Sequence, residues 1–258
     1  MDRKAVIQSA QLKHLYSTSN AALITSCILA SILAFMQREV TSTYILLYWL
    51  AAVTLVSTSR AALIYSYKRA SVENDSIHHA HLIRFRLGVL VAGLVWGSAG
   101  IFMFPTNAPQ HQLFLIFMLA GLSAGSVISY SADLVSAIVY SVSVITPLLI
   151  RLMLLGNSFS IAMSISVMLY LGFMIINSRH NYLSLYENIV LRLEANEREH
   201  AVKVRNEWHQ AILEGTMDGF WLVDTQGNLL EVNQTYSQMS GYSIQELLSM
   251  KISDLEAI

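Results

Sequence analysis

The segment Thr43–Tyr67 reads TYILLYWLAAVTLVSTSRAALIYSY, and its composition decides the class of fold. It holds no acidic residue and a single basic residue, Arg60. A helix needs about 20 consecutive, mainly apolar residues to cross the roughly 30 Å hydrocarbon layer of a membrane. The segment therefore predicts a transmembrane helix that carries one cation inside it.

The whole chain has the composition of a membrane protein. Hydrophobic residues make up 54% of its 258 residues and charged residues only 13%, whereas an ordinary soluble domain has about 25% charged residues. The charges gather before Asn20, between Lys68 and Arg86, and after Asn177, so the formal net charge of -1 hides a strong segregation. The expected partner is a lipid bilayer, and no nucleic-acid partner is indicated.

Five further apolar segments are long enough, or nearly so, to span the same layer. They lie near residues 20–36, 87–104, 112–130, 134–156 and 160–177. The first does not read as a cleaved signal peptide, because its apolar run ends in FMQRE without a small-residue cleavage site. We therefore expect a cytoplasmic N-terminal segment at residues 1–19 and a six-helix transmembrane domain at residues 20–177.

Lysines and arginines in the flanking loops predict the orientation of the bundle. With the N-terminus inside, the cytoplasmic side holds most basic residues, while the outer side holds only Arg38 and Arg151. Both termini are then cytoplasmic. The outer connections, near residues 37–42, 105–111 and 156–159, are far shorter than the ~50 residues of a small domain. Any stimulus must therefore act within the bilayer, at its surfaces or on the cytoplasmic side.

Arg60 is the ionisable residue with the strongest bearing on function. It precedes Lys68 by eight residues, which places it about 12 Å of helix rise inside the inner boundary. Two interpretations stay open: the side chain snorkels to the interface, or it faces the bundle as a buried, functional cation paired with Asp133. Trp49 and Trp96 either line a cavity, pack within the bundle or anchor it at an interface.

Two glycine pairs indicate close packing of helices. Gly93 and Gly97 occur in GLVWG, and Gly121 and Gly125 in GLSAG, so each pair lies on one helix face where backbones can approach. Packing within the chain is the simpler interpretation, and dimerisation through either pair is the alternative. Pro147 removes a backbone donor from the fifth span and predicts a kink there.

Three histidines precede the third span. His78, His79 and His81 lie beside Arg84 and Arg86, and a solvated basic loop facing anionic lipid is the favoured interpretation. No Cys, Asp or Glu stands at a recognisable metal-finger spacing, so no metal site is predicted.

The stretch from residue 182 to residue 211 predicts one continuous helix, because it has no Pro or Gly and is rich in Glu, Arg, Leu and Asn. We assign residues 178–211 to this linker helix. A heptad pattern interrupted by Glu197, His200 and Glu207 indicates a weak coiled coil, whose core positions are Leu183, Tyr186, Val190, Leu193, Val204 and Ala211. Either a parallel homodimer transmits conformational change through this helix, or the helix is a passive amphipathic tether.

The stretch DGFWLVDTQGNLLEVNQTYSQMSGYSIQELL, which begins at Asp218, predicts a small α+β unit. Two strands, GFWLV and LLEV, flank a turn at residues 224–227. Two short helices follow: Asn233 caps the first, Gly241 ends it, and Ser243 with Glu246 forms a capping box for the second. This pattern resembles the N-terminal half of a PAS domain. The resemblance implies a truncated PAS domain at residues 212–258, without the long helix and the three later strands that complete the fold.

The membrane segments are similar to the MASE-like sensor regions of bacterial diguanylate cyclases, phosphodiesterases and sensor histidine kinases. The similarity rests on Trp49 and Arg60 in the second span, GLVWG in the third, AGLSAG in the fourth and Thr146-Pro147 in the fifth. It implies an all-α six-helix bundle in the bacterial inner membrane, followed by a linker helix and a partial α+β PAS domain. Such a region passes a membrane or small-molecule stimulus to an output domain. The similarity also implies a homodimer that is joined through the linker helix and the PAS domain.

The chain carries no GGDEF, EAL, kinase phosphoacceptor or ATP-binding motif, so no catalytic residue is predicted in it. Cyclic-di-GMP turnover is the favoured output and a histidine kinase the next. A small transporter or channel is the alternative, although transporters usually show a broken helix or acidic coupling residues at mid-membrane. The cofactor of the PAS segment stays open. LOV-type flavin photochemistry is not expected, because Ile252 stands where that class has its reactive Cys.

Overall fold

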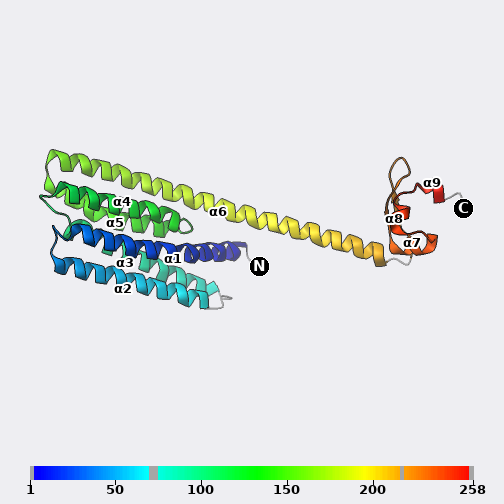
Figure 1. Ribbon diagram of the computed structural model, residues 1–258, viewed down its shortest axis with the longest axis horizontal. Helices are drawn as coiled ribbons and strands as arrows, with labels where there is room; N and C mark the ends of the chain where they lie inside the picture. The colour runs from blue at the N-terminus through cyan, green and yellow to red at the C-terminus, as the bar shows by residue number, and fades with distance from the viewer. Residues whose placement is uncertain (1–2, 70–74, 216–217, 256–258) are drawn as a thin grey trace. The chain divides into compact units, whose positions relative to one another are not determined.

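The computed structural model describes residues 3–69, 75–215 and 218–255 (Figure 1). The chain divides into two compact units, Met1–Val190 and Leu191–Ile258, and each is described by itself. Six helices are long and apolar enough to cross a membrane. They are α1 (Arg3–Gln37), α2 (Thr43–Arg69), α3 (Asp75–Phe102), α4 (Pro109–Ser129), α5 (Leu134–Leu155) and α6 (Ser158–Gly215). The predicted multi-pass helical membrane bundle is confirmed.

The helices of the first unit pack around a shared apolar core in which α3 is central. α3 packs most extensively against α5 and also against α2, while α1 contacts α2 and α4. Side chains on the outside are apolar too: Leu154 is 75% exposed and Phe117 71%. An apolar surface of this extent fits lipid rather than water. Deeply buried core residues include Leu33, Val89, Ala99, Leu119 and Val144.

Helices α1 and α3 begin earlier than the spans predicted from hydropathy. α1 starts at Arg3, so the predicted N-terminal segment continues the first span as one helix. Leu12, Leu15 and Tyr16 are buried there, because residues three and four apart share one face of a helix. α3 starts at Asp75, and the predicted histidine loop is therefore helical.

The prediction of a solvated basic face is wrong for His81. This residue is 8% exposed and makes edge-to-face contacts with Tyr16 and Tyr67, whose rings stack with centroids 4.0 Å apart. The Tyr16 hydroxyl also donates to the carbonyl oxygen of His81 at 3.4 Å. The aromatic rings of α1 and α2 thus cover the imidazole. The side chains of His78 and His79 lie outside the described residues.

Helices α3 and α5 approach each other at the glycines of the third span. A Cβ atom at Gly93 would lie 2.8 Å from the Cβ of Ser143, and one at Gly97 would overlap the carbonyl oxygen of Ser143. The ring of Pro147, inside α5, lies 3.0 Å from the same Gly97 position. This glycine pair therefore allows α3 to pack closely against α5 of the same chain.

The sixth span and the predicted linker form one helix, α6, of 58 residues. A heptad stripe on its second half is uncovered in the single chain: Leu183 is 52% exposed, Tyr186 40% and Val204 47%. Lys203 and Glu207 stand at i, i+4 spacing with 4.0 Å between their charged atoms, a pair that adds only a few tenths of a kcal/mol to a helix.

In the second unit, β1 (Trp221–Val223) and β2 (Leu229–Val232) form an antiparallel pair in which Trp221 lies opposite Val232. The turn between them uses Gly227 at φ 81, a left-handed conformation that glycine adopts without steric cost. The helices α7 (Gln234–Ser240), α8 (Ile244–Leu247) and α9 (Ile252–Leu255) follow. Leu229, Val232 and Leu247 form the small apolar core of this unit.

The predicted helix signals of the second unit are confirmed. The side chain of Asn233 accepts from the backbone N–H of Tyr236, and Gly241 ends α7 in the left-handed region. Ser243 and Glu246 form the capping box at the start of α8. Each signal satisfies backbone donors that the helix leaves unpaired, so the local sequence sufficed to predict it.

We predict that Gly97→Ala destabilises the bundle, because the added methyl would overlap the backbone of α5. Overpacking of a tight contact costs about 1–3 kcal/mol. Gly125→Ala is the matched control, since a Cβ atom there meets nothing within 4 Å. Thermal unfolding of the two variants in detergent should show a lower Tm for Gly97→Ala only. Equal melting temperatures would contradict the close approach of α3 and α5.

Candidate functional site

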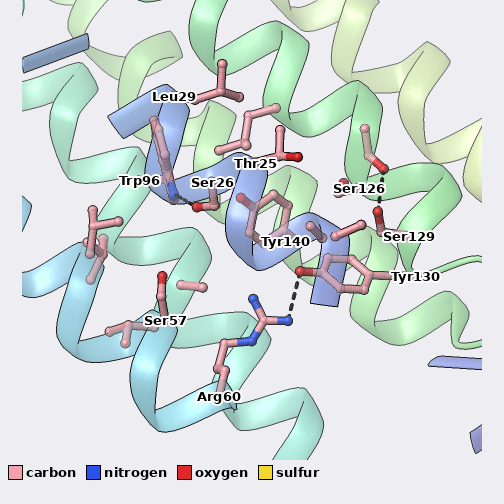
Figure 2. A pocket seen from close by; sticks show the side chains of 18 of the residues that line it. Thr25, Ser26, Leu29, Ser57, Arg60, Trp96, Ser126, Ser129, Tyr130 and Tyr140 are labelled. Carbon is pink, nitrogen blue, oxygen red and sulfur yellow. Dashed lines mark hydrogen bonds between the residues drawn. The ribbon is translucent and has the colours of Figure 1, made fainter. Parts of the chain in front are cut away.

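A cavity of about 270 Å³ opens inside the bundle, lined by residues of α1, α2, α3, α4 and α5 (Figure 2). Its volume is just below the range of about 300–1,000 Å³ in which drug-sized ligands bind. The cavity holds both polar and apolar side chains, and Arg60 is its charged member. We call it the Arg60 cavity.

The Arg60 cavity exists because small residues face it. Gly121 and Gly125 line one wall, and a Cβ atom at either position would meet nothing within 4 Å. Ala21 and Ala22 of α1 line another part of it. The second predicted packing pair therefore differs from the first: no side chain of a neighbouring helix fills the space that its glycines leave.

Arg60 faces the interior of the bundle and is only 7% exposed. Its Nη2 donates to the hydroxyl of Tyr130 at 3.0 Å, and its guanidinium carbon lies 5.8 Å from the ring centre of Phe85 and 5.6 Å from that of Tyr130. Gly88 of α3 makes room for it, since a Cβ there would lie 3.3 Å from Cγ of Arg60. Arg60 is therefore a buried cation that faces the bundle, and its side chain does not snorkel to the interface.

The contacts of Arg60 offset the cost of its burial without using all of its donors. A charged side chain at the centre of a membrane helix costs about 2.5–3.5 kcal/mol on insertion scales. Two cation–π contacts at about 0.5–1 kcal/mol or more each and a charge-assisted hydrogen bond at about 1.5–3 kcal/mol are of similar size. Within the described residues, Arg60 makes no salt bridge and one hydrogen bond, although a guanidinium has five N–H donors.

Several hydroxyl groups line the Arg60 cavity, and they fall into two classes. Thr18 donates to backbone carbonyls of α1 and α4, and Ser126 and Ser129 donate within α4. By contrast, the hydroxyls of Ser57 and Tyr140 form no hydrogen bond among the described residues, although both residues line the cavity and are less than a tenth exposed. These two hydroxyls are available to a molecule in the cavity.

The two predicted tryptophans have different places. Trp96 lines the cavity, and its indole N–H donates to the hydroxyl of Ser26 at 2.9 Å. Trp49 packs behind it, edge to face with ring centroids 5.0 Å apart, and donates to the carbonyl oxygen of Val95 at 2.8 Å. Trp96 therefore shapes the cavity, and Trp49 fixes the position of Trp96.

Asp133 pairs with Arg86, and the predicted pairing with Arg60 does not form in the part of the chain that the structure describes. Arg86 donates to both carboxylate oxygens, at 2.7 and 2.9 Å. Asp133 also caps α5, where it accepts from the backbone N–H and hydroxyl of Ser136. Burial alone would raise the pKa of Asp133, but the bonds from Arg86 and Ser136 outweigh it and hold that pKa below its usual value.

Several residues of the site were not singled out from the sequence: Tyr130, Tyr140, Ser57 and Phe85. A signal for part of the site was present, because Gly121, Gly125 and Ser129 follow at four-residue spacing and share one face of α4. Small and hydroxyl-bearing residues on one face indicate either close packing or a polar cavity. The sequence alone does not distinguish them, since the answer depends on the facing helix.

Residues 209–257 match the family model described as the PAS fold. Neither the curated proteins nor the solved structures contain a match to this chain. A PAS segment therefore follows the membrane bundle, as the sequence predicted.

We predict that Asp133→Asn lowers stability at neutral pH by about 1–3 kcal/mol, because it removes the charge that pairs with Arg86. Asn remains a good helix cap, so the change isolates the ion pair. Since the pKa of Asp133 is depressed in the fold, its contribution is present at neutral pH and lost as pH falls below the ordinary aspartate value of ~3.9. The difference in melting temperature between the two proteins should therefore shrink as pH falls from 7 to about 3. A constant difference at all pH values would contradict this role.

Proposed function

We propose that this chain is the signal-input region of a bacterial signal-transduction protein, which senses a stimulus in the Arg60 cavity and passes it through α6 to the PAS segment. One observation carries the proposal. A helix that begins as a membrane span continues without a break toward a segment that matches the PAS fold. A continuous helix transmits rotation or displacement over its whole length, whereas a flexible linker of the same length would not.

A short path of contacts leads from the cavity to α6. Gly121 and Leu122 of α4 line the cavity. On the same helix, the carbonyl oxygen of Ala120 accepts from the hydroxyl of Tyr170 at 2.6 Å, and the Ser123 hydroxyl lies 2.9 Å from the same group. Tyr170 belongs to α6. A molecule that displaces α4 therefore acts directly on the helix that leaves the membrane.

The uncovered heptad stripe of α6 supports a parallel homodimer as the transmitting form. Glu197, His200 and Glu207 interrupt the apolar positions of the stripe, so the pairing is weak and able to shift between two packings. A small change of α6 in the membrane then changes the packing of two PAS segments.

The output that we favour is cyclic-di-GMP turnover, with a histidine kinase next, and it lies outside this chain. Neither output has a catalytic motif here. The alternative, a small transporter or channel, has less support, because helices α2 to α5 contain no Asp or Glu except Asp75 at the start of α3. Coupling of transport to ions usually needs such residues.

The first prediction of this proposal concerns topology. The excess of Lys and Arg on one side predicts that Arg69 and Arg205 lie in the cytoplasm and Arg38 on the outer side of the inner membrane. Fusions of alkaline phosphatase and of green fluorescent protein after each residue test this, because the first is active only outside and the second fluoresces only inside. A phosphatase signal after Arg205 would contradict the input role, since the PAS segment would then face away from the cytoplasm.

A second prediction concerns output. In the gene product that carries this chain, Arg60→Ala should change the cellular level of cyclic-di-GMP by several-fold while membrane insertion stays normal. Arg38→Ala is the matched control, because Arg38 is exposed and lies outside the cavity. If cyclic-di-GMP does not respond, autophosphorylation is measured with the same variants. No response of either output to Arg60→Ala would refute the role of the cavity in signalling.

A further inference from the structure

The Arg60 cavity has its charge toward one end, and its deeper end is lined by apolar side chains together with the Ser26 hydroxyl that accepts from Trp96. On α2, Arg60 follows Val53 by about two turns of helix, and Tyr130, which directly follows α4, comes about two turns after Leu122. Both helices run toward the end of the bundle where Arg69 ends α2 and where α4 meets α5. The cation and its hydroxyl partner therefore lie toward that end, and Val53, Leu122 and Trp96 lie deeper in the bundle.

The charged end offers donors for an anion and no acidic competitor among the described residues. Arg60 keeps N–H donors that no described group accepts, and Ser57 and Tyr140 keep free hydroxyls. Figure 2 shows the side chains of Arg60, Ser57 and Tyr140 around the same space. Since Asp133 is paired with Arg86, the positive charge of Arg60 is balanced by no carboxylate in the part of the chain that the structure describes.

We propose that the cavity binds a small monocarboxylic acid with a short apolar tail. Its carboxylate lies against the guanidinium of Arg60, in the forked geometry that matches two carboxylate oxygens to two N–H donors. The hydroxyls of Ser57 and Tyr140 complete the site, and the tail points toward Trp96. The proposal names the ligand of the sensor role described above and rests on it.

Size and charge favour this class over other anions. A cavity of about 270 Å³ holds a molecule smaller than a typical drug. One guanidinium neutralises one negative charge, whereas a phosphate ester carries nearly two and would leave the second unpaired in a span where uncompensated charge is costly. The apolar tail displaces water from the surfaces of Trp96, Val53 and Leu122. A small inorganic anion has no such tail and would leave that water in place.

Hexanoate and 1-hexanol test the proposal, because they share a tail and differ in the head group. The full chain is purified into nanodiscs, and binding of each radiolabelled probe is measured by equilibrium dialysis, with empty nanodiscs subtracted. The chain should bind hexanoate at least about tenfold more tightly than 1-hexanol, a difference of the size expected for one charge-assisted pair. Arg60→Gln should remove this preference. Equal binding of the two probes by the unaltered chain would overturn the proposal.

A second pair of variants decides the question even if Arg60→Gln does not fold. Gly121→Leu places a side chain in the cavity without a backbone clash, and Gly172→Leu makes the same change on α6 at another position where a Cβ atom meets nothing within 4 Å. Gly121→Leu should lose hexanoate binding, and Gly172→Leu should keep it. Hexanoate binding that survives in Gly121→Leu would place the site elsewhere and refute the proposal.

These binding measurements are independent of the output assay. If hexanoate binds and Gly121→Leu abolishes binding, but Arg60→Ala leaves every output unchanged, the ligand proposal stands and the signalling role fails. If Arg60→Ala changes output while the chain fails to bind hexanoate in preference to 1-hexanol, the signalling role stands and the carboxylate proposal is wrong.

Discussion

An arginine held inside a hydrocarbon layer is the constraint on which the rest of the site depends. The guanidinium stays charged, so its surroundings must supply compensation. Phe85 and Tyr130 provide ring faces, the Tyr130 hydroxyl provides an acceptor, and Gly88 provides space. Small residues on α1 and α4 then leave a cavity beside the charge instead of filling it. The chain thus keeps a cation with spare donors beside a cavity.

A second structural feature is the continuity of α6, which is one helix from Ser158 to Gly215. Its membrane part is tied to α4 by Tyr170, and its second half presents an uncovered heptad stripe. The Arg86–Asp133 pair fixes the turn between α4 and α5 to α3, so α4 is held firmly at that end. Movement of α4 in response to a ligand is therefore expected near Gly121 and Ala120, where the cavity lies on one side and Tyr170 on the other.

Features that depend on residues close together in the sequence were predictable from the sequence. The six spans follow from apolar length, and the caps at Asn233, Gly241 and Ser243 follow from side chains that bond the nearest free backbone groups. Features that depend on how one helix is rotated against another were not. Asp133 had two arginines near the same end of the bundle, and only packing decides that Arg86 reaches it. His81 looked solvated because the two tyrosines that cover it come from α1 and α2.

The two glycine pairs also show that the packing of one helix against another is not predictable from local sequence. Gly93 with Gly97 and Gly121 with Gly125 have the same four-residue spacing, and each pair lies in an apolar span. The first pair meets Ser143 and Pro147 of α5, while the second meets open space. A glycine in the sequence shows only that one side of the helix backbone carries no side chain. Whether that side contacts another helix or lines a cavity depends on the helix that faces it.

The central claim is that the Arg60 cavity controls the pairing of α6, and disulfide cross-linking tests it most directly. Cys27 is the only cysteine, so single cysteines placed from Leu183 to Val204 in a Cys27→Ser background report which faces meet in membranes. We expect cross-linking to peak at Leu183, Val190 and Val204, and the strongest position to shift when Arg60→Ala is added. Cross-linking without a heptad period, or an identical pattern in the presence of Arg60→Ala, would contradict the account.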